Sequence, residues 1–151
     1  MKKIVIWGTG QYASYIFKDI LMNKCFFEGF VDNNNKKQNR LWENQYRIYS
    51  LEKSIELDID YYLISAMYYK EQILSQAKSL GIENKLIWYW HDDLSQYEFI
   101  NNTSYLKENI LLKIKIDKLQ RQVNNAPYEY GKSPVKIRPA KDLLEKIIDK
   151  K

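Results

Sequence analysis

The first 90 residues alternate between continuous apolar runs and segments in which apolar residues recur at helical spacing. Continuous runs are typical of strands buried on both faces of a parallel sheet. Together with shorter β-like runs, they predict strands at residues 3–7, 26–31, 60–65 and 85–90, with a weaker strand at 46–49. Helical periodicity covers residues 11–22 and 69–80, the second ending at Gly81, and a short helix-like stretch begins near Ser50. Five strands alternating with helices predict a small doubly wound α/β domain, Rossmann-like, with a parallel five-stranded sheet.

The pattern changes near residue 100, which predicts a domain boundary there. Over residues 104–124 a heptad-like seam predicts one long helix, with seam positions Tyr105, Leu112, Ile116, Leu119 and Val123. After a break at residues 124–127, Pro139 starts a second predicted helix. We therefore expect a nucleotide-binding domain over residues 1–100 and a basic helical extension over residues 101–151. The unpartnered seam predicts a homodimer through these C-terminal helices.

Charge separates the same two parts. Residues 1–100 carry 12 Lys and Arg against 13 Asp and Glu, whereas residues 101–151 carry 12 against 6, so the net charge of +5 comes from the extension. Acids are interspersed among its basic residues, which favours a solvated helical face over a surface for nucleic acid. We expect no nucleic-acid partner.

Composition narrows the class of protein further. The chain is 45% apolar and 28% charged, and no run approaches the roughly 20 apolar residues that cross a bilayer. The apolar run after the basic N-terminus stops at Gly8, too early for a signal peptide. The single cysteine, Cys25, and the single histidine, His91, provide neither an internal disulfide nor a metal cage. The sequence therefore predicts a cytoplasmic protein with no transmembrane segment and no metal.

Two glycines follow the first predicted strand, in the order Gly8-Thr9-Gly10-Gln11-Tyr12-Ala13. In such turns the first glycine permits a sharp bend, the second lets backbone approach a diphosphate, and a small third residue lets helix pack on sheet. The main-chain amides of residues 8–12 are expected to be free to bind an anion. Asp32 ends the next strand, 22 residues beyond Gly10, where such folds accept hydrogen bonds from ribose hydroxyls. Together these features predict a nucleotide site; the alternatives are a structural glycine turn and a turn-forming Asp32.

Five ordered segments resemble the small Rossmann-type domain of bacterial surface-polysaccharide biosynthesis proteins: IVIWGTGQYASYIFKDIL, FEGFVDNN, IYSLEKS, DYYLISAMYYKEQILSQAKSLGI and NKLIWY. Such domains occur alone, fused to sugar methyltransferases or glycosyltransferases, and at the N-terminus of nucleotide-sugar acyltransferases. The resemblance covers about residues 1–90. It implies a bound nucleotide or nucleotide-sugar, and we expect NAD(P) or a UDP-type nucleotide-sugar. The implied contacts are Gly8, Thr9, Gly10, Gln11 and Tyr12, then Asp32 and Asn33, then Ser65, Ala66 and Met67.

The function expected from these features is nucleotide or nucleotide-sugar binding in cell-surface sugar assembly, without a complete catalytic site. One alternative is a small NAD-dependent sugar-nucleotide epimerase or dehydrogenase, with Tyr128 and Lys132, or a tyrosine near Ser65, as the proton donor. Pro127 and Gly131 argue against the helix on which a Tyr-x-x-x-Lys pair works. A structural module with a vestigial phosphate turn is the third possibility.

Other chemistry-bearing residues carry weaker hypotheses. Ser14 with His91, Asp92 and Asp93 is rejected as a hydrolase triad, because a serine inside a helix lacks the exposed elbow of a nucleophile. The run Trp88-Tyr89-Trp90 is expected to be core and sheet edge, with a stacking platform for a base as the alternative. Cys25 has no base near it in sequence. Trp7 stands where S-adenosylmethionine sites usually carry an acid, which disfavours that ligand.

Overall fold

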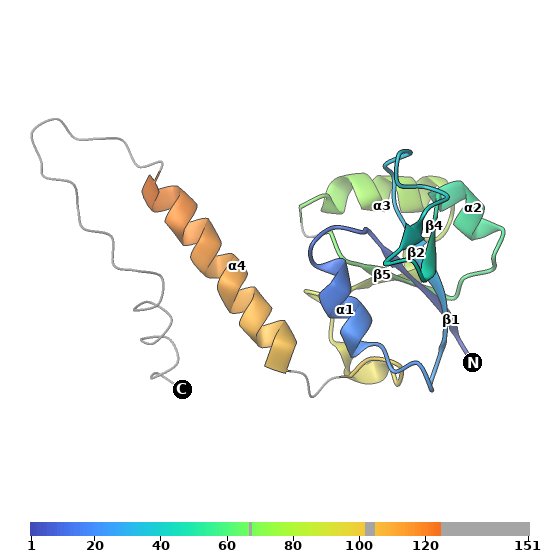
Figure 1. The fold of residues 1–151 in the computed structure, drawn as a ribbon, viewed down its shortest axis with the longest axis horizontal. Coiled ribbons are helices and arrows are strands. Elements are labelled where there is room, and N and C mark those ends of the chain that lie inside the picture. Colours follow the sequence, from blue (N-terminus) through green and yellow to red (C-terminus); the bar gives the residue numbers. More distant parts are fainter. Residues whose placement is uncertain (67, 102–104, 125–151) are drawn as a thin grey trace, which may run out of the picture. The chain divides into compact units, whose positions relative to one another are not determined.

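The structure is a computed structural model that describes residues 1–66, 68–101 and 105–124. The chain divides into two compact units, Met1–Ser104 and Tyr105–Lys151. Among the described residues, the first unit contains a six-stranded sheet, three α-helices and two short 3-10 helices, and the second contains one long α-helix. Figure 1 draws the fold coloured along the sequence.

The sheet has the strand order β3-β4-β2-β1-β5-β6. Its strands are β1 (Lys3–Trp7), β2 (Phe26–Val31), β3 (Leu41–Trp42), β4 (Tyr46–Tyr49), β5 (Tyr61–Ile64) and β6 (Leu86–Trp88). Neighbouring strands are parallel except β3 and β4, which are antiparallel. The chain builds outward from β1 in both directions, which is the doubly wound arrangement expected from the sequence and places a ligand crevice beyond the carboxyl ends of β1 and β5.

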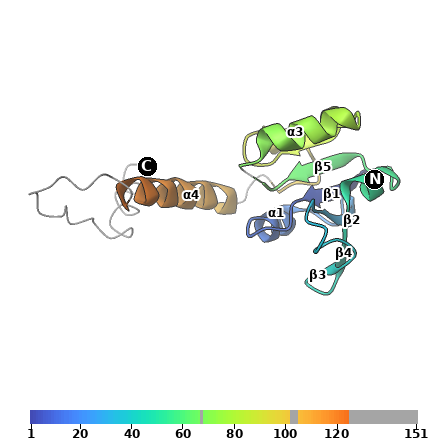
Figure 2. The same cartoon turned by 90° about the horizontal axis from the view of Figure 1, so that it is seen from above.

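Helices cover both faces of this sheet. Figure 2 shows α1 (Ala13–Asp19) on one face and α3 (Lys70–Ser79) on the opposite face. The short helix α2 (Leu51–Ile55) contributes Leu51 to the same buried cluster as Ile73 of α3 and Val5 and Trp7 of β1. Because alternate residues of a strand point to opposite faces, Ile4 and Ile6 point toward the α1 side. All of these β1 side chains are at most 2% exposed, so β1 is the centre of the core.

The segment after β6 completes the α1 side of the sheet. Phe99 O accepts a hydrogen bond from Leu21 N at 2.8 Å, and Ile100 forms an antiparallel bridge with Ile20. The hydroxyl of buried Tyr89 donates to the carboxylate of Asp19, which is also buried. The chain beyond β6 therefore belongs to the first unit at least as far as Ile100.

The elements predicted for the first 90 residues are present, several of them with shorter bounds. The strands at residues 3–7, 26–31 and 46–49 are confirmed, and Gly81 has the left-handed φ of +69° expected after α3. The helix predicted over residues 11–22 covers only 13–19, because Ile20 is extended. The strand predicted over residues 85–90 ends at Trp88, whose carbonyl accepts from the amides of His91 and Asp92 in a turn.

The predicted count of five strands was wrong. The sixth, β3, is a two-residue edge strand that pairs with β4 across a tight turn, with φ of 48° at Glu43 and 58° at Asn44. Two residues are too few to show apolar alternation, so the sequence pattern predicts no strand there.

The second unit begins with α4 (Tyr105–Asn124), close to the predicted residues 104–124. Leu119 and Val123 of the predicted seam are 53% and 48% exposed. The second predicted helix, from Pro139, lies outside the described residues. Among the described residues, no helix is long and apolar enough to span a membrane. The division into a nucleotide-binding domain and a basic extension stays a prediction.

Candidate functional site

A cavity of about 520 Å³ lies at the carboxyl ends of β1, β2 and β5. Its lining includes nine of the ten residues expected at a ligand site, namely Gly8, Thr9, Gly10, Gln11, Tyr12, Asp32, Asn33, Ser65 and Ala66. The tenth, Met67, lies outside the described residues. The structure thus brings three segments that are far apart in sequence to one hollow, and their binding of a nucleotide stays a prediction.

Gly8 turns the chain sharply out of β1 against Ser65. Its φ is +110°, and a Cβ at this position would lie 2.3 Å from Ser65 Oγ. Its N–H donates to Val31 O at 2.7 Å, which ties the turn to the end of β2. The first glycine is therefore required by its backbone angle and by its neighbour.

Gly10 has the opposite environment, because a Cβ added there would meet no atom within 4 Å. Among the described residues, the amides of Gly10, Gln11 and Tyr12 have no hydrogen-bond partner. The expectation that all amides of residues 8–12 are free was wrong at two positions, since Gly8 N and Thr9 N bond within the protein. Three adjacent donors therefore line the cavity beside open space, which is the arrangement a phosphate oxygen requires.

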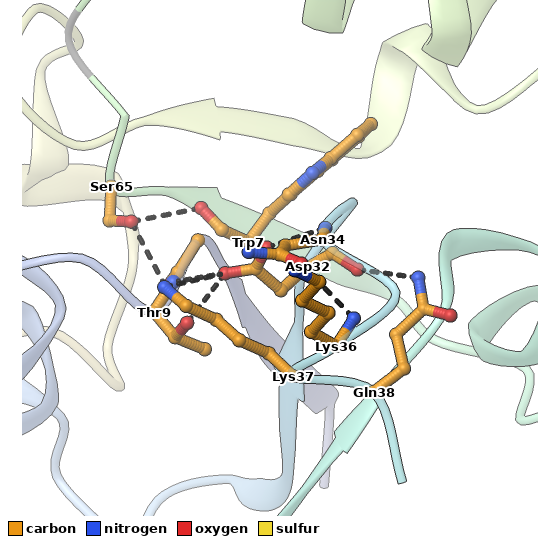
Figure 3. A network of polar contacts seen from close by, with 9 residues as sticks. Trp7, Thr9, Asp32, Asn34, Lys36, Lys37, Gln38 and Ser65 are labelled. Carbon is orange, nitrogen blue, oxygen red and sulfur yellow. Dashed lines mark hydrogen bonds and ion pairs between the residues drawn. The ribbon is translucent and has the colours of Figure 1, made fainter. Parts of the chain in front are cut away.

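Asp32 is engaged by the protein itself (Figure 3). Its Oδ2 accepts from Thr9 N at 3.1 Å and from Thr9 Oγ1 at 2.5 Å. Its Oδ1 accepts from Asn34 N at 2.9 Å. The ammonium of Lys37 lies 3.9 Å from Oδ2, while the Asp32 side chain is 14% exposed. The carboxylate therefore holds the glycine turn and the loop after β2 together.

Ser65 and Trp90 form the support beneath the turn. Ser65 is buried, and its hydroxyl donates to Trp7 O at 2.9 Å and to Gly8 O at 3.2 Å, sharing one hydrogen between the two carbonyls. Trp90 Nε1 donates to Ser65 O at 3.0 Å, and its ring packs edge-on against Tyr12 at 5.7 Å. Trp90 thus holds Ser65 and Tyr12, which both line the cavity, without lining it itself.

The aromatic run at residues 88–90 divides into core and sheet edge, as its first interpretation held, with Tyr89 and Trp90 buried and Trp88 half-buried on the edge strand β6. Tyr89 and Trp90 are 2% and 5% exposed, and neither lines the cavity. The Trp88 ring is covered by the ammonium of Lys70, 5.5 Å from its centroid. A stacking platform for a base built from Tyr89 and Trp90 was the wrong alternative, because both side chains are buried in protein.

Several lining residues were not named by the sequence analysis, which pointed only to an unspecified tyrosine near Ser65. Lys37 comes from the loop after β2, while Tyr68, Tyr69, Gln72 and Ile73 come from the start of α3 and the segment before it. Tyr68 and Tyr69 are 71% and 62% exposed, which is unusual for large aromatic residues. Their place directly after a predicted strand was the available signal, because ligand sites in such sheets form there.

A side-chain hydrogen bond connects the two sides of the cavity region. Asn33 Nδ2 donates to Gln76 Oε1 at 2.9 Å, linking the loop after β2 to α3. Asn33 was expected at the site from the resemblance, and the structure places it on the cavity lining. Its amide nitrogen is engaged by α3.

The site offers binding groups more clearly than catalytic ones. Ser14 Oγ lies 3.4 Å from Gln11 O and does not line the cavity, which agrees with rejecting the hydrolase triad. Burial raises the pKa of the Cys25 thiol, as expected for an unreactive cysteine. Within the described part of the chain, no group of three His, Cys, Asp or Glu could hold a metal ion. Tyr128 and Lys132 lie outside that part.

Comparisons with known proteins match the first unit to one family model. The model, described as C2185-like, N-terminal, matches residues 1–88. No curated protein matches the chain. Among solved structures, UDP-D-quinovosamine 4-dehydrogenase from Vibrio fischeri is similar at 18% identity and a TM-score of 0.41, over 54% of this chain and 72% of that one. The structure of RSP in complex with beta-NAD+ and operator DNA is similar at 14% identity and a TM-score of 0.43, over 85% of this chain and 63% of that one.

Proposed function

The chain belongs to the C2185-like, N-terminal family, and on that premise we propose that its first unit binds a nucleotide or nucleotide-sugar in the cavity beyond β1. The observation that carries the proposal is the row of amides at Gly10, Gln11 and Tyr12, which have no hydrogen-bond partner in the described part of the chain. A Cβ added at Gly10 would meet open space. Phosphate oxygens are the ligand atoms that such a row of donors best fits.

The remaining lining fits the rest of a nucleotide. Lys37 supplies a cation that is 46% exposed, close enough to the cavity to meet a phosphate charge. Tyr68 and Tyr69 supply exposed aromatic surface, and the lining also carries amide side chains from Gln11, Asn34 and Gln72. These groups suit NAD(P) or a UDP-type nucleotide-sugar, the two ligands expected from the sequence.

The proposed setting is surface-polysaccharide or sugar biosynthesis in the cytoplasm, supported by the resemblance of residues 1–90. In this setting the protein presents a bound nucleotide-sugar without a complete catalytic site of its own.

The basic extension over residues 101–151 is proposed to form a homodimer, supported by the exposed seam residues Leu119 and Val123. Small molecules, and no nucleic acid, are the proposed partners of the first unit.

One observation favours the enzyme alternative enough to test it. Tyr68 and Tyr69 lie on the cavity lining close to Ser65, where a proton donor to a bound sugar would be needed. That alternative predicts a change in nicotinamide absorbance when NAD and an activated sugar are mixed with the protein. Loss of the change in Tyr69→Phe or Tyr68→Phe, with binding intact, would assign the proton donor.

Isothermal titration calorimetry on the full chain tests the binding proposal, with NAD, NADP, UDP, UDP-sugars, coenzyme A and S-adenosylmethionine as probes. Lys37→Ala is expected to weaken binding of a diphosphate roughly tenfold, since a hydrogen bond to a charged group contributes about 1.5 kcal/mol. Lys53→Ala is the matched control, because Lys53 is also exposed and paired with a carboxylate, Glu56, but does not line the cavity. Silence from every probe would remove the proposal.

A further inference from the structure

The protein itself occupies most of the hydrogen-bond acceptor positions of the Asp32 carboxylate, and too few are left to bind both hydroxyls of a ribose. An ionised carboxylate offers about four acceptor positions, two on each oxygen. Thr9 N and Thr9 Oγ1 fill the two positions on Oδ2, and Asn34 N fills one on Oδ1. One position on Oδ1 is left, whereas a ribose diol that binds an acid side-on presents two hydroxyl donors.

The loop after β2 holds the carboxylate in this arrangement from its own side (Figure 3). Gln38 Nε2 donates to Asp32 O at 2.9 Å, and Asp32 N donates to Tyr49 O at 3.1 Å. Asn34 Oδ1 accepts from Lys36 N at 3.0 Å. The Asp32 main chain is thus fixed on both sides, so its side chain cannot leave Thr9 without breaking a connected network.

From this geometry we infer that Asp32 is a positioning residue that braces the glycine turn, and that the hydroxyl of Thr9 takes the place of a ribose hydroxyl on its carboxylate. The brace connects the end of β2 to the residue directly before Gly10, and so sets where the free amides of Gly10, Gln11 and Tyr12 lie. The ligand is then selected by its phosphates and not by its ribose 2′-hydroxyl. The selectivity rests on the proposed function, whereas the brace does not.

The brace is tested in the full chain without ligand, by urea unfolding of Thr9→Val, Asp32→Asn and the double variant. Valine removes the hydroxyl and keeps the shape, and asparagine leaves a single acceptor oxygen. Each single change is expected to raise the unfolding equilibrium constant about tenfold, and the double change to raise it about tenfold as well, not a hundredfold. Thr9→Ser, which keeps the hydroxyl, is expected to stay within about threefold of the wild type. Additive effects of the two single changes would overturn the brace.

The selectivity is tested by titrating the same wild-type chain with ADP and 2′-deoxy-ADP, and with UDP and 2′-deoxy-UDP. The dissociation constants within each pair are expected to agree within about threefold, because Asp32 has one acceptor position left and the 3′-hydroxyl, which both compounds of a pair carry, can fill it. Weakening by more than tenfold in the deoxy compounds would overturn the inference. If neither nucleotide of a pair binds, the proposed function fails for that ligand, and the ligand-free unfolding cycle still decides for or against the brace.

Discussion

Replacing Gly8 by alanine tests the structural half of the account without any ligand. Gly8 has a φ of +110°, which L side chains rarely adopt. The new Cβ would also lie 2.3 Å from Ser65 Oγ, far inside contact distance. Ser65 Oγ has little freedom to withdraw, because it is buried and bonded to the carbonyls of Trp7 and Gly8. Backbone and contact both oppose the substitution.

The cost follows from these two terms. An unfavourable backbone angle costs about 1–3 kcal/mol, and overpacking a tight site costs about 1–3 kcal/mol. We expect the free energy of unfolding to fall by about 3 kcal/mol, a large share of the roughly 5–15 kcal/mol of a typical domain. For a unit of about 100 residues this corresponds to a decrease in Tm of roughly 10–20 °C.

Urea unfolding followed by circular dichroism measures the effect, with two comparison variants. In Gly8→Ala/Ser65→Ala the nearest atoms to the new Cβ are Ala66 N and the residue 65 Cβ, both at 3.7 Å, so the steric part of the cost should vanish and the backbone part should remain. Gly10→Ala should change stability by less than about 0.5 kcal/mol, because its Cβ meets open space. The reasoning is refuted if Gly8→Ala unfolds like the wild type, or if removing Ser65 Oγ recovers nothing.

Three further changes probe other parts of the molecule. Tyr89→Phe removes the donor to buried Asp19 and should cost about 2 kcal/mol in urea unfolding. Burial and Asp19 raise the pKa of Tyr89 above its ordinary 10.0, so the stability that the Tyr89 hydroxyl contributes is complete below pH 10 and is lost as the pH rises further. The variant should therefore lose less stability between pH 10 and 11 than the wild type does. An equal change of unfolding free energy with pH in both proteins would contradict this. Trp90→Phe removes the Nε1 donor to Ser65 O and should cost about 1–2 kcal/mol, with weaker nucleotide binding in calorimetry, and unchanged stability and affinity would refute its supporting role. Leu119→Asp places a charge at the exposed end of the seam of α4, beyond buried Ile116, and should turn the proposed dimer into a monomer in sedimentation velocity. The same assembly state in both proteins counts against the helices as the interface.

The sequence predicted the parts of the fold that depend on burial. β1 is an almost continuous apolar run because both of its faces are covered, and such a run can be recognised in one sequence without an alignment. The short strand β3 depends instead on a hairpin turn at Glu43 and Asn44, which both have a left-handed backbone. Asparagine favours that conformation but glutamate does not, so the pair is a weak turn signal. Its two residues were therefore invisible to a periodicity argument.

The candidate site was predictable in its location more than in its hydrogen bonding. The ends of β1, β2 and β5 must meet at one edge of a parallel sheet, so the site residues could be grouped before their coordinates were known. Which donor occupies Asp32 depends on the path of the loop through Asn34 and on the rotamer of Thr9, and neither is encoded in a spacing. Lys37 joined the cavity for the same reason, through a loop fold that composition does not reveal.

The central claim is that the main-chain amides of Gly10, Gln11 and Tyr12 bind the phosphates of a nucleotide. Proton–nitrogen correlation spectra of the labelled full chain, recorded while UDP and then NAD are added, report on each amide directly. The account predicts that these three amide signals shift in a saturable way with at least one of the nucleotides, and shift more than those of Gly8 and Thr9, which are already bonded to Val31 and Asp32. Saturable shifts that leave residues 10–12 unmoved, or no shifts at millimolar nucleotide, would contradict it.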